Sequence, residues 1–322
     1  MEIVFLGTSS GTPTRTRNVS AIAVRRDNSK FWSLVDCGEG TQQQILRTNL
    51  ALNSLQAIFI THVHGDHCYG LPGLLASASM AGRTDPLWII GPPEIKVFLD
   101  AVQLNTQLRL PYSLRFICTE DVADSFTHQD IDFDVETVAL SHRVPSFAYV
   151  FSEKNIQPKL DVEKLQQAGI IQGPLWGRIQ QGEDSTLPDG RLIQAKNFLQ
   201  SSRSPRKIII AGDNDTPGLL AECAKTAQVL VHESTYTHEV AIKVGSEPQH
   251  SSAKIVAQFA DECAIENLVL THFSPRYQDN VAYSPSIADI EAEAKNFYHG
   301  NLFLAKDFDI FHLDKMGCLD EI

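Results

Sequence analysis

The chain lacks any C-x-x-C pair, although it has six cysteines in 322 residues, and this absence excludes a zinc ribbon and a dithiol redox motif. It also lacks a run of roughly 18 apolar residues, the length that a membrane-spanning helix needs. The opening Met-Glu-Ile has neither the basic nor the apolar region of a secretory leader. We therefore expect a cytoplasmic protein that does not contact a membrane.

Positive charge is scarce as well. The 27 Lys and Arg residues are outnumbered by 39 Asp and Glu residues, which gives a net charge of −12. This sign excludes binding to a polyanion by bulk attraction, so nucleic acid can be held only where basic residues are locally concentrated, and DNA is not expected as a partner. With 43% hydrophobic and 20% charged residues, the composition is otherwise that of an ordinary globular protein.

Short apolar runs alternate with helix-like segments along most of the chain. The first three runs follow one another closely, as in hairpins, so two mixed sheets covered by helices fit better than one doubly wound parallel sheet. The expected strands are about 2–7, 19–26, 31–36, 55–61, 87–91, 131–140, 147–152, 207–211, 229–232 and 268–271, with two more near the end. The expected helices are about 39–49, 69–81, 93–105, 218–224, 251–263 and 286–298.

Residues 154–203 interrupt this pattern. They are rich in Gly and Pro and only weakly periodic, which is typical of an extended insertion. Seven basic and five acidic residues give the segment a charge of +2, which leaves −14 for the rest of the chain. We expect the segment to be too thin to hold a core of its own and to be anchored by apolar contacts of Leu175 and Trp176; the alternative is a surface loop without a partner.

The segment 61–67, Thr-His-Val-His-Gly-Asp-His, carries the chemistry. Because alternate residues of an extended segment face different ways, His62 and His64 can point to one cation while Asp66 and His67 point to another. Nitrogen and carboxylate ligands without thiolate are typical of catalytic zinc. A lone histidine is usually structural, but four ligands on one loop have no competing role in packing, so the motif predicts a metal site.

Three later residues, His142, Asp213 and His272, each follow an apolar strand. Singly, each would be an ordinary residue at the end of a strand, but as a set they supply the ligands of a dinuclear centre. Two cations that share Asp213 would generate hydroxide at neutral pH for in-line attack on a phosphodiester. Histidine and carboxylate ligands suit zinc, and manganese is an alternative.

This motif and the later His, Asp and His resemble the metallo-β-lactamase superfamily. Over essentially its whole length, the chain resembles the ribonuclease Z family, endonucleases that trim precursor tRNA. The segments that carry the likeness are 5–13, 36–41, 61–71, 140–142, 211–213, 232–235 and 271–277. The resemblance implies an αβ/βα sandwich as one domain over 1–322, with 154–203 inserted as a protruding flexible arm.

The resemblance also implies a set of ligands. One zinc ion would be bound by His62, His64 and His142, the other by Asp66, His67 and His272, and Asp213 would bridge the two. Asp66 would in addition accept the proton in the reaction.

Further active-site residues are expected around these ligands. His250 matches an additional active-site histidine of the family, with Ser252 where the family often has Thr. It could donate a proton to the leaving 3′ oxygen or steady the scissile phosphate, or make only a local hydrogen bond. Asp36, His232 and Glu233 are expected to orient ligands rather than bind metal, with strand-end capping as the alternative.

Two basic segments are expected to contact RNA. The loop 13–18, Pro-Thr-Arg-Thr-Arg-Asn, resembles the family's P-x-K-x-R-N loop, with an arginine fork in place of the lysine. The resemblance implies that the arm grips the tRNA elbow and that, in a homodimer, the arm of one subunit serves the site of the other. The RNA-binding candidates are Arg15, Arg17, Lys159, Lys164 and Arg178.

The leading hypothesis is a zinc endoribonuclease that removes the 3′ trailer from precursor tRNA by hydroxide attack, leaving a 3′-hydroxyl on the tRNA and a 5′-phosphate on the trailer. A small-molecule phosphodiesterase or arylsulfatase of the same superfamily is the alternative enzyme. An RNA-binding scaffold with a dead site is the non-enzymatic alternative, against which the complete ligand set speaks.

Overall fold

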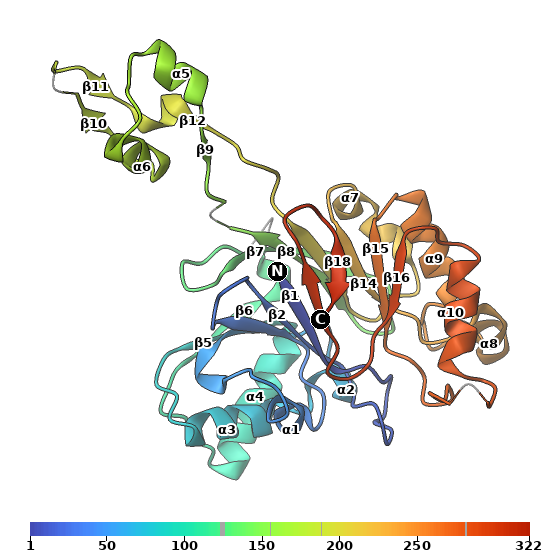
Figure 1. Cartoon of the computed structure of the whole chain (residues 1–322). Helices are drawn as coiled ribbons and strands as arrows, with labels where there is room; N and C mark the ends of the chain where they lie inside the picture. Colours follow the sequence, from blue (N-terminus) through green and yellow to red (C-terminus); the bar gives the residue numbers. More distant parts are fainter. Residues whose placement is uncertain (123–125, 155, 188, 281) are drawn as a thin grey trace. The chain divides into compact units, whose positions relative to one another are not determined.

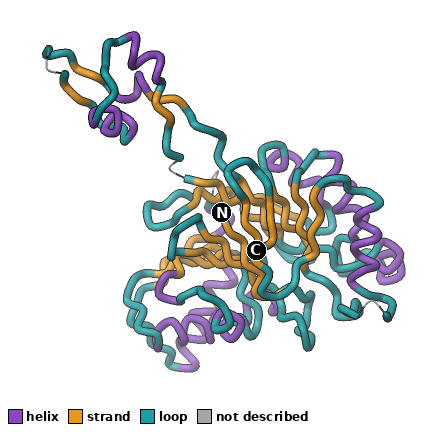
Figure 2. The backbone as a smooth tube through the Cα atoms, in the orientation of Figure 1, coloured by secondary structure: helices purple, strands orange, loops and turns teal. Residues whose placement is uncertain are grey.

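The structure is a computed structural model that describes residues 1–122, 126–154, 156–187, 189–280 and 282–322 (Figure 1). The chain divides into two compact units. The larger comprises Met1–Ser152 and Arg206–Ile322, and the smaller is Glu153–Pro205. Figure 2 shows that strands occupy the middle of the larger unit and helices its outside.

The first sheet of the larger unit has the strand order β18-β17-β1-β2-β3-β4-β5-β6. The strands from β3 to β6 are parallel, whereas β1 is antiparallel to both β2 and β17. Their bounds are β1 Glu2–Gly7, β2 Ala21–Arg25, β3 Trp32–Val35, β4 Leu55–Phe59, β5 Leu87–Gly91, β6 Leu114–Cys118, β17 Ile310–Leu313 and β18 Leu319–Glu321.

The second sheet has the order β16-β15-β14-β13-β8-β7. Its strands β13 to β16 are parallel, so their carboxyl ends reach the same edge, while β8 runs antiparallel to β13. The bounds are β7 Phe133–Leu140, β8 Ser146–Glu153, β13 Lys207–Ala211, β14 Val229–Glu233, β15 Asn267–Thr271 and β16 Asn301–Leu304.

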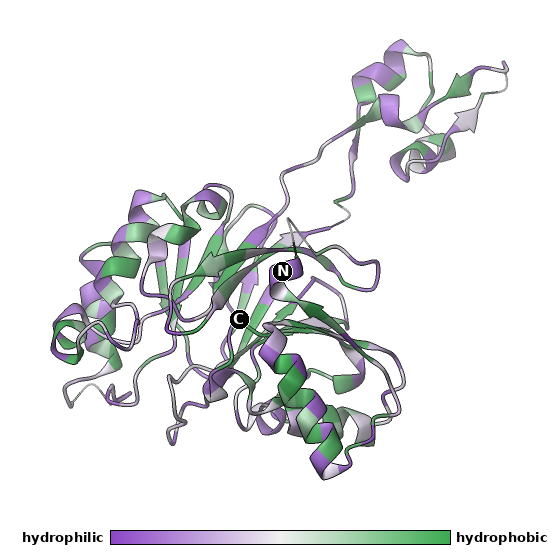
Figure 3. Ribbon diagram, turned by 180° about the vertical axis from the view of Figure 1, so that it is seen from behind, coloured by the Kyte–Doolittle hydropathy of each residue, from purple (hydrophilic) through white to green (hydrophobic). Residues whose placement is uncertain are grey.

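Apolar side chains separate the layers. Phe5, Phe59 and Phe151 belong to a buried core that both sheets share, and helices cover the outer face of each sheet. The helices are α1 Thr41–Ile45, α2 Gly65–Cys68, α3 Leu71–Met80, α4 Pro93–Thr106, α7 Ala221–Ala224, α8 His238–Val244, α9 Ala253–Glu262 and α10 Ile287–Lys295, with 3₁₀ turns η1 Leu52–Ser54, η2 Thr119–Asp121 and η4 Pro217–Leu220. This confirms the expected αβ/βα sandwich of two mixed sheets. In Figure 3 the strands are mostly apolar and the helices alternate in polarity.

Several elements of the larger unit were not predicted from the sequence, among them β6, α8, the short helix α2 and one of the three closing strands β16, β17 and β18. The strand β6 ends the sheet order and is only partly buried, so its apolar pattern is weak. The helix α8 has no fully buried residue, and its Val240 packs against the core while only partly buried, so its apolar pattern is weak. Among the described residues, no helix is long and apolar enough to cross a membrane.

The smaller unit has a small core of its own. Leu165, Ile179 and Ile193 are buried, and Leu175 and Trp176 pack against them, so these two residues stabilise the unit itself. Its elements are β9 Lys159–Leu160, α5 Val162–Gln167, α6 Pro174–Gln180, β10 Ser185–Thr186, β11 Leu192–Ile193, η3 Ala195–Phe198 and β12 Leu199–Gln200. The expectation of an extended insertion without a core was therefore wrong, because elements this short leave no clear periodicity.

Candidate metal centre

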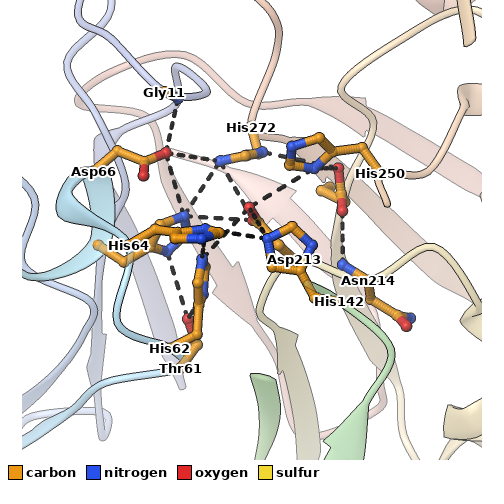
Figure 4. Close-up of polar contacts among 12 residues, drawn as sticks. Gly11, Thr61, His62, His64, Asp66, His142, Asp213, Asn214, His250 and His272 are labelled. Carbon is orange, nitrogen blue, oxygen red and sulfur yellow. Dashed lines mark hydrogen bonds and ion pairs between the residues drawn. The ribbon is translucent and has the colours of Figure 1, made fainter. Parts of the chain in front are cut away.

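The predicted ligands gather where strands of both sheets end (Figure 4). His62 and His64 follow β4, and the short helix α2 carries Asp66 and His67. From the second sheet, His142 follows β7, Asp213 follows β13 and His272 follows β15. The structure thus brings all of the predicted metal ligands together in two adjoining groups.

The first group surrounds one point. His64 Nδ1 lies 3.1 Å from both His62 Nε2 and His142 Nε2. Asp213 Oδ2 lies 3.6 Å from His62 Nε2 and 3.7 Å from His142 Nε2. Tetrahedral ligands at zinc–nitrogen distances of about 2.0–2.1 Å are separated by about 3.4 Å, so this spacing suits one cation.

The second group has the same spacing. His272 Nε2 lies 3.3 Å from His67 Nε2 and 3.4 Å from Asp66 Oδ2. The other oxygen of Asp213, Oδ1, lies 3.4 Å from His67 Nε2 and 3.3 Å from His272 Nε2. Asp213 therefore presents one carboxylate oxygen to each group, as a bridging ligand does.

The electrostatics of the cluster also suit cations. Burial lowers the pKa of His62 well below its usual value, so its imidazole is neutral and able to coordinate. Burial opposes the charged form of Asp213, but the surrounding histidines hold its pKa well below the usual range. Burial alone would lower the pKa of His272, yet Asp213 and neighbouring carboxylates raise it to about 10. Buried carboxylates thus attract positive charge here, which a divalent metal would supply if bound.

Asp36 orients the first-sheet ligands. Its Oδ2 lies 2.6 Å from His67 Nδ1, and its Oδ1 accepts a hydrogen bond of 2.8 Å from the Thr61 backbone N–H. The Thr61 hydroxyl lies 3.0 Å from His62 Nδ1. Asp36 has a left-handed backbone (φ 59°), a strained conformation that these hydrogen bonds hold in place.

Three supporting residues were missed from the sequence. Thr235 Oγ1 lies 3.0 Å from His272 Nδ1, and the carbonyl oxygen of Gln249 lies 2.9 Å from His142 Nδ1. Together with Thr61, they fix the rings through the nitrogen that faces away from the cluster. Only adjacency to predicted site residues could have indicated Thr61 and Gln249.

His250 lies beside the ligands and pairs with Glu233. Its Nδ1 is 2.9 Å from Glu233 Oε2 and 3.7 Å from Asp213 Oδ2. Although burial works against it, the Glu233 carboxylate raises the pKa of His250. Because Nδ1 is engaged, Nε2 is the nitrogen of His250 left to act on a substrate.

The ring nitrogens of His232 bond to Asn214 and to the Glu233 backbone rather than to a predicted ligand. It is fully buried, its Nδ1 lies 2.8 Å from the Glu233 carbonyl oxygen, and its Nε2 lies 3.1 Å from Asn214 Nδ2. Asn214 in turn donates its backbone N–H to Glu233 Oε1 at 2.7 Å. His232 therefore acts on the site indirectly, because it holds Asn214 in place beside Glu233.

The expected RNA contact of Arg17 disagrees with the structure. Its side chain is only 5% exposed, and it donates to Asp279 Oδ1 at 2.8 Å and to the Ala305 carbonyl oxygen at 2.6 Å. Because its guanidinium is bonded to Asp279 and Ala305, Arg17 holds the loop in place rather than facing RNA. Arg15, by contrast, is exposed.

The other predicted RNA-binding residues lie on the smaller unit. Lys159, Lys164 and Arg178 are all exposed. Lys164 Nζ lies 3.1 Å from Asp161, and Arg178 Nε lies 3.0 Å from Glu183. Because the basic side chain of each pair is exposed, a phosphate can displace its carboxylate partner.

Alanine variants of Arg17 and Arg15 are expected to differ in both stability and tRNA binding. Arg17→Ala should lower the free energy of unfolding by about 2 kcal/mol, because it removes buried charge-assisted hydrogen bonds. Arg15→Ala should change stability by less than about 0.5 kcal/mol and weaken tRNA binding. Thermal unfolding and filter binding measure the two effects. If Arg17→Ala leaves stability unchanged but reduces tRNA affinity, Arg17 contacts the RNA after all.

Comparison with known sequences identifies close relatives. Curated ribonuclease Z of Marinobacter nauticus is 54% identical over 315 residues, which cover 98% of this chain and 97% of the relative. Ribonuclease Z of Pseudomonas putida strain GB-1 is 48% identical, with all of both chains covered. A family model described as anti-Pycsar protein Apyc1 matches residues 1–155.

Solved structures agree with this relationship. The short form of human tRNase Z is 26% identical, has a TM-score of 0.66, and is matched over 98% of this chain and 100% of its own. The metallo-β-lactamase fold protein YhfI of Bacillus subtilis also has a TM-score of 0.66, at 16% identity, over 96% of this chain and 97% of its own, which shows the shared fold. Because its relatives are up to 54% identical along nearly the full length, the chain belongs to the ribonuclease Z family of endoribonucleases and has the metallo-β-lactamase fold.

Proposed function

We propose that this protein is a zinc-dependent endoribonuclease that removes the 3′ trailer from precursor tRNA. The products would be a tRNA with a 3′-hydroxyl and a trailer with a 5′-phosphate. The observation that carries the proposal is the position of Asp213, whose two oxygens face two separate groups of ligand atoms. The relatives named ribonuclease Z support the choice of substrate. Such a substrate would place the protein in the cytoplasm.

When bound, two divalent cations supply Lewis acidity that activates water and offsets charge on the phosphate. The chain's own residues then handle protons and orientation. We assign Asp66 Oδ1 as the proton acceptor, because the other oxygen, Oδ2, is the one that faces His67 and His272 and accepts a hydrogen bond of 2.7 Å from the Gly11 N–H. We assign His250 Nε2 as the proton donor to the leaving 3′ oxygen, with Glu233 holding the ring.

Cleavage of a precursor tRNA by the purified protein, with and without a chelator, tests the proposal. We expect a single cut at the junction with the trailer, lost with the chelator and restored by added zinc. Parallel reactions restored with manganese compare the two metals. Failure to cut the precursor, together with rapid hydrolysis of a small phosphodiester, would favour the alternative phosphodiesterase.

His250→Ala is expected to lower kcat for the precursor about 10²- to 10⁴-fold, because the leaving oxygen loses its proton donor. The metal content should stay at the wild-type value, since neither of the two groups assigned as cation sites uses His250, although His250 could also hold an ion together with Asp213 and His272. Single-turnover cleavage and elemental analysis are the measurements. His299→Ala, which removes an exposed histidine paired with Asp261, is the matched control. Loss of metal in His250→Ala would instead identify His250 as a ligand.

The smaller unit is proposed to bind the tRNA. The segment 154–203 has a charge of +2 in a chain of net charge −12, and Lys159, Lys164 and Arg178 are exposed on it. Phosphate contacts by such residues bind RNA without reading its sequence. The acidic remainder of the chain would discourage RNA from binding elsewhere.

A homodimer is proposed as the active assembly. Leu46, after α1, and Met80, at the end of α3, are large apolar side chains exposed on the helical layer of the first sheet. Val97 and Leu104, seven residues apart on one side of α4, are exposed as well. A second copy of the chain would cover such a surface. Sedimentation measures the mass, and a monomer at all concentrations would contradict this proposal.

A further inference from the structure

A small hollow lies between the start of α1 and the chain that joins α2 to α3. It has a volume of about 260 Å³, and Glu39, Gln42, Gln43 and Tyr69 supply its side chains. Glycines, among them Gly70 and Gly73, complete its lining. The lining contains no lysine or arginine and does include a carboxylate, so an unscreened phosphate does not suit it.

Tyr69 places an aromatic surface in this hollow, next to the metal-binding loop. A Cβ atom on Gly65 would lie 2.2 Å from Tyr69 Cε2, so the ring rests directly on Gly65, between His64 and Asp66 in the chain. The ring of Phe98 lies 6.3 Å away, centroid to centroid. Even so, Tyr69 is 64% exposed. A held but exposed ring is a platform on which a planar group can stack.

The remaining side chains offer hydrogen bonds around this platform. Gln42 Oε1 accepts a hydrogen bond from Ser77 at 3.3 Å, which leaves its NH₂ group to donate. Gln43 and Glu39 are exposed, and the backbone oxygen of Glu39 accepts from Asn18 Nδ2 at 2.9 Å. Asn18 belongs to the loop that also carries Arg15. The hollow therefore lies between that loop and the metal-binding loop.

We propose that this hollow binds one unpaired base of the RNA next to the scissile phosphate, a subsite that rests on the proposed function. The base stacks on Tyr69, and its edge is bound by Gln42, Gln43 and Glu39. Aromatic rings and amide side chains are the groups with which proteins recognise single-stranded RNA. A base also carries no charge, which agrees with the absence of cations from the lining.

Tyr69→Ala is expected to lower kcat/KM for the precursor about 5- to 100-fold, the range for loss of one stacked base. Tyr69→Phe, which keeps the ring, should stay within about 2-fold of wild type. Metal content, measured by elemental analysis, should be unchanged in both variants. Full activity of Tyr69→Ala would overturn the subsite, as would loss of metal with an equal loss of activity.

Precursors with an abasic residue on either side of the cut identify the base. At the position whose base stacks on Tyr69, the abasic precursor already lacks the contact. Wild type and Tyr69→Ala should therefore cut that precursor at the same reduced rate. If Tyr69→Ala slows both abasic precursors as much as the intact one, the ring does not bind a base. Absence of cleavage of the intact precursor by wild type would overturn the proposed function, and with it the subsite.

Glu39→Gln tests the edge of the base. A carboxylate accepts from the amino group of cytosine, whereas an amide can also donate to the O4 of uracil. At the position identified with the abasic precursors, the variant should therefore cut the uracil precursor faster, relative to the cytosine precursor, than wild type does. An unchanged ratio would remove Glu39 from the subsite.

Discussion

Asp213→Ala is expected to lower the rate of precursor cleavage at least about 1000-fold. Asp213 contributes an oxygen to each group of ligand atoms, so its removal weakens both cation sites at once. It also leaves His67 and His272 without the carboxylate between them. Elemental analysis should find fewer than two metal ions per chain.

The control for this variant is Asp215→Ala. Asp215 lies two residues further along the same loop, and its carboxylate accepts from the Thr216 hydroxyl rather than facing the cluster. It should retain wild-type metal content and activity. An Asp213→Ala protein that keeps two metal ions and cleaves at more than a tenth of the wild-type rate would show that the bridge is not needed.

Replacing residues 156–202 with a short flexible linker is expected to lower kcat/KM for precursor tRNA about 100-fold or more. Hydrolysis of methyl p-nitrophenyl phosphate should stay near the wild-type rate. The larger unit should still fold, because its buried clusters contain no residue of the removed segment. A parallel loss of both activities would contradict a division of labour between the two units.

The salt dependence of tRNA binding tests the contribution of individual basic residues of the smaller unit. The triple variant of Lys159, Lys164 and Arg178 to alanine leaves the small core of the unit intact, since all three side chains are exposed. Each lost phosphate contact should reduce the slope of log affinity against log salt by about 1. An unchanged slope would exclude these residues from the RNA interface.

The ligand groups were predictable because they depend on one simple property of the fold. His142, Asp213 and His272 each follow an apolar strand, and strands that end at a common edge bring distant residues together. His62 to His67 needed only local spacing. The same signals predicted the sandwich, since apolar runs of this length define strands in both sheets.

Residues whose role depends on burial could not be assigned in this way. Arg17 and Arg15 are two positions apart in one polar loop, and nothing local distinguishes them. Arg17 is buried because Asp279 and Ala305, more than 260 residues away, surround its guanidinium. The core of the smaller unit was missed for a related reason, because it joins short elements that are individually too weak to recognise.

The order of the ligands along the chain has a consequence for synthesis. His62 to His67 emerge early from the ribosome, but Asp213 and His272 follow only after β13 and β15 have been made. Because the centre draws on both sheets, a nascent chain shorter than 272 residues holds no complete pair of cation sites. A chain still being translated would therefore lack the proposed centre until His272 has been added.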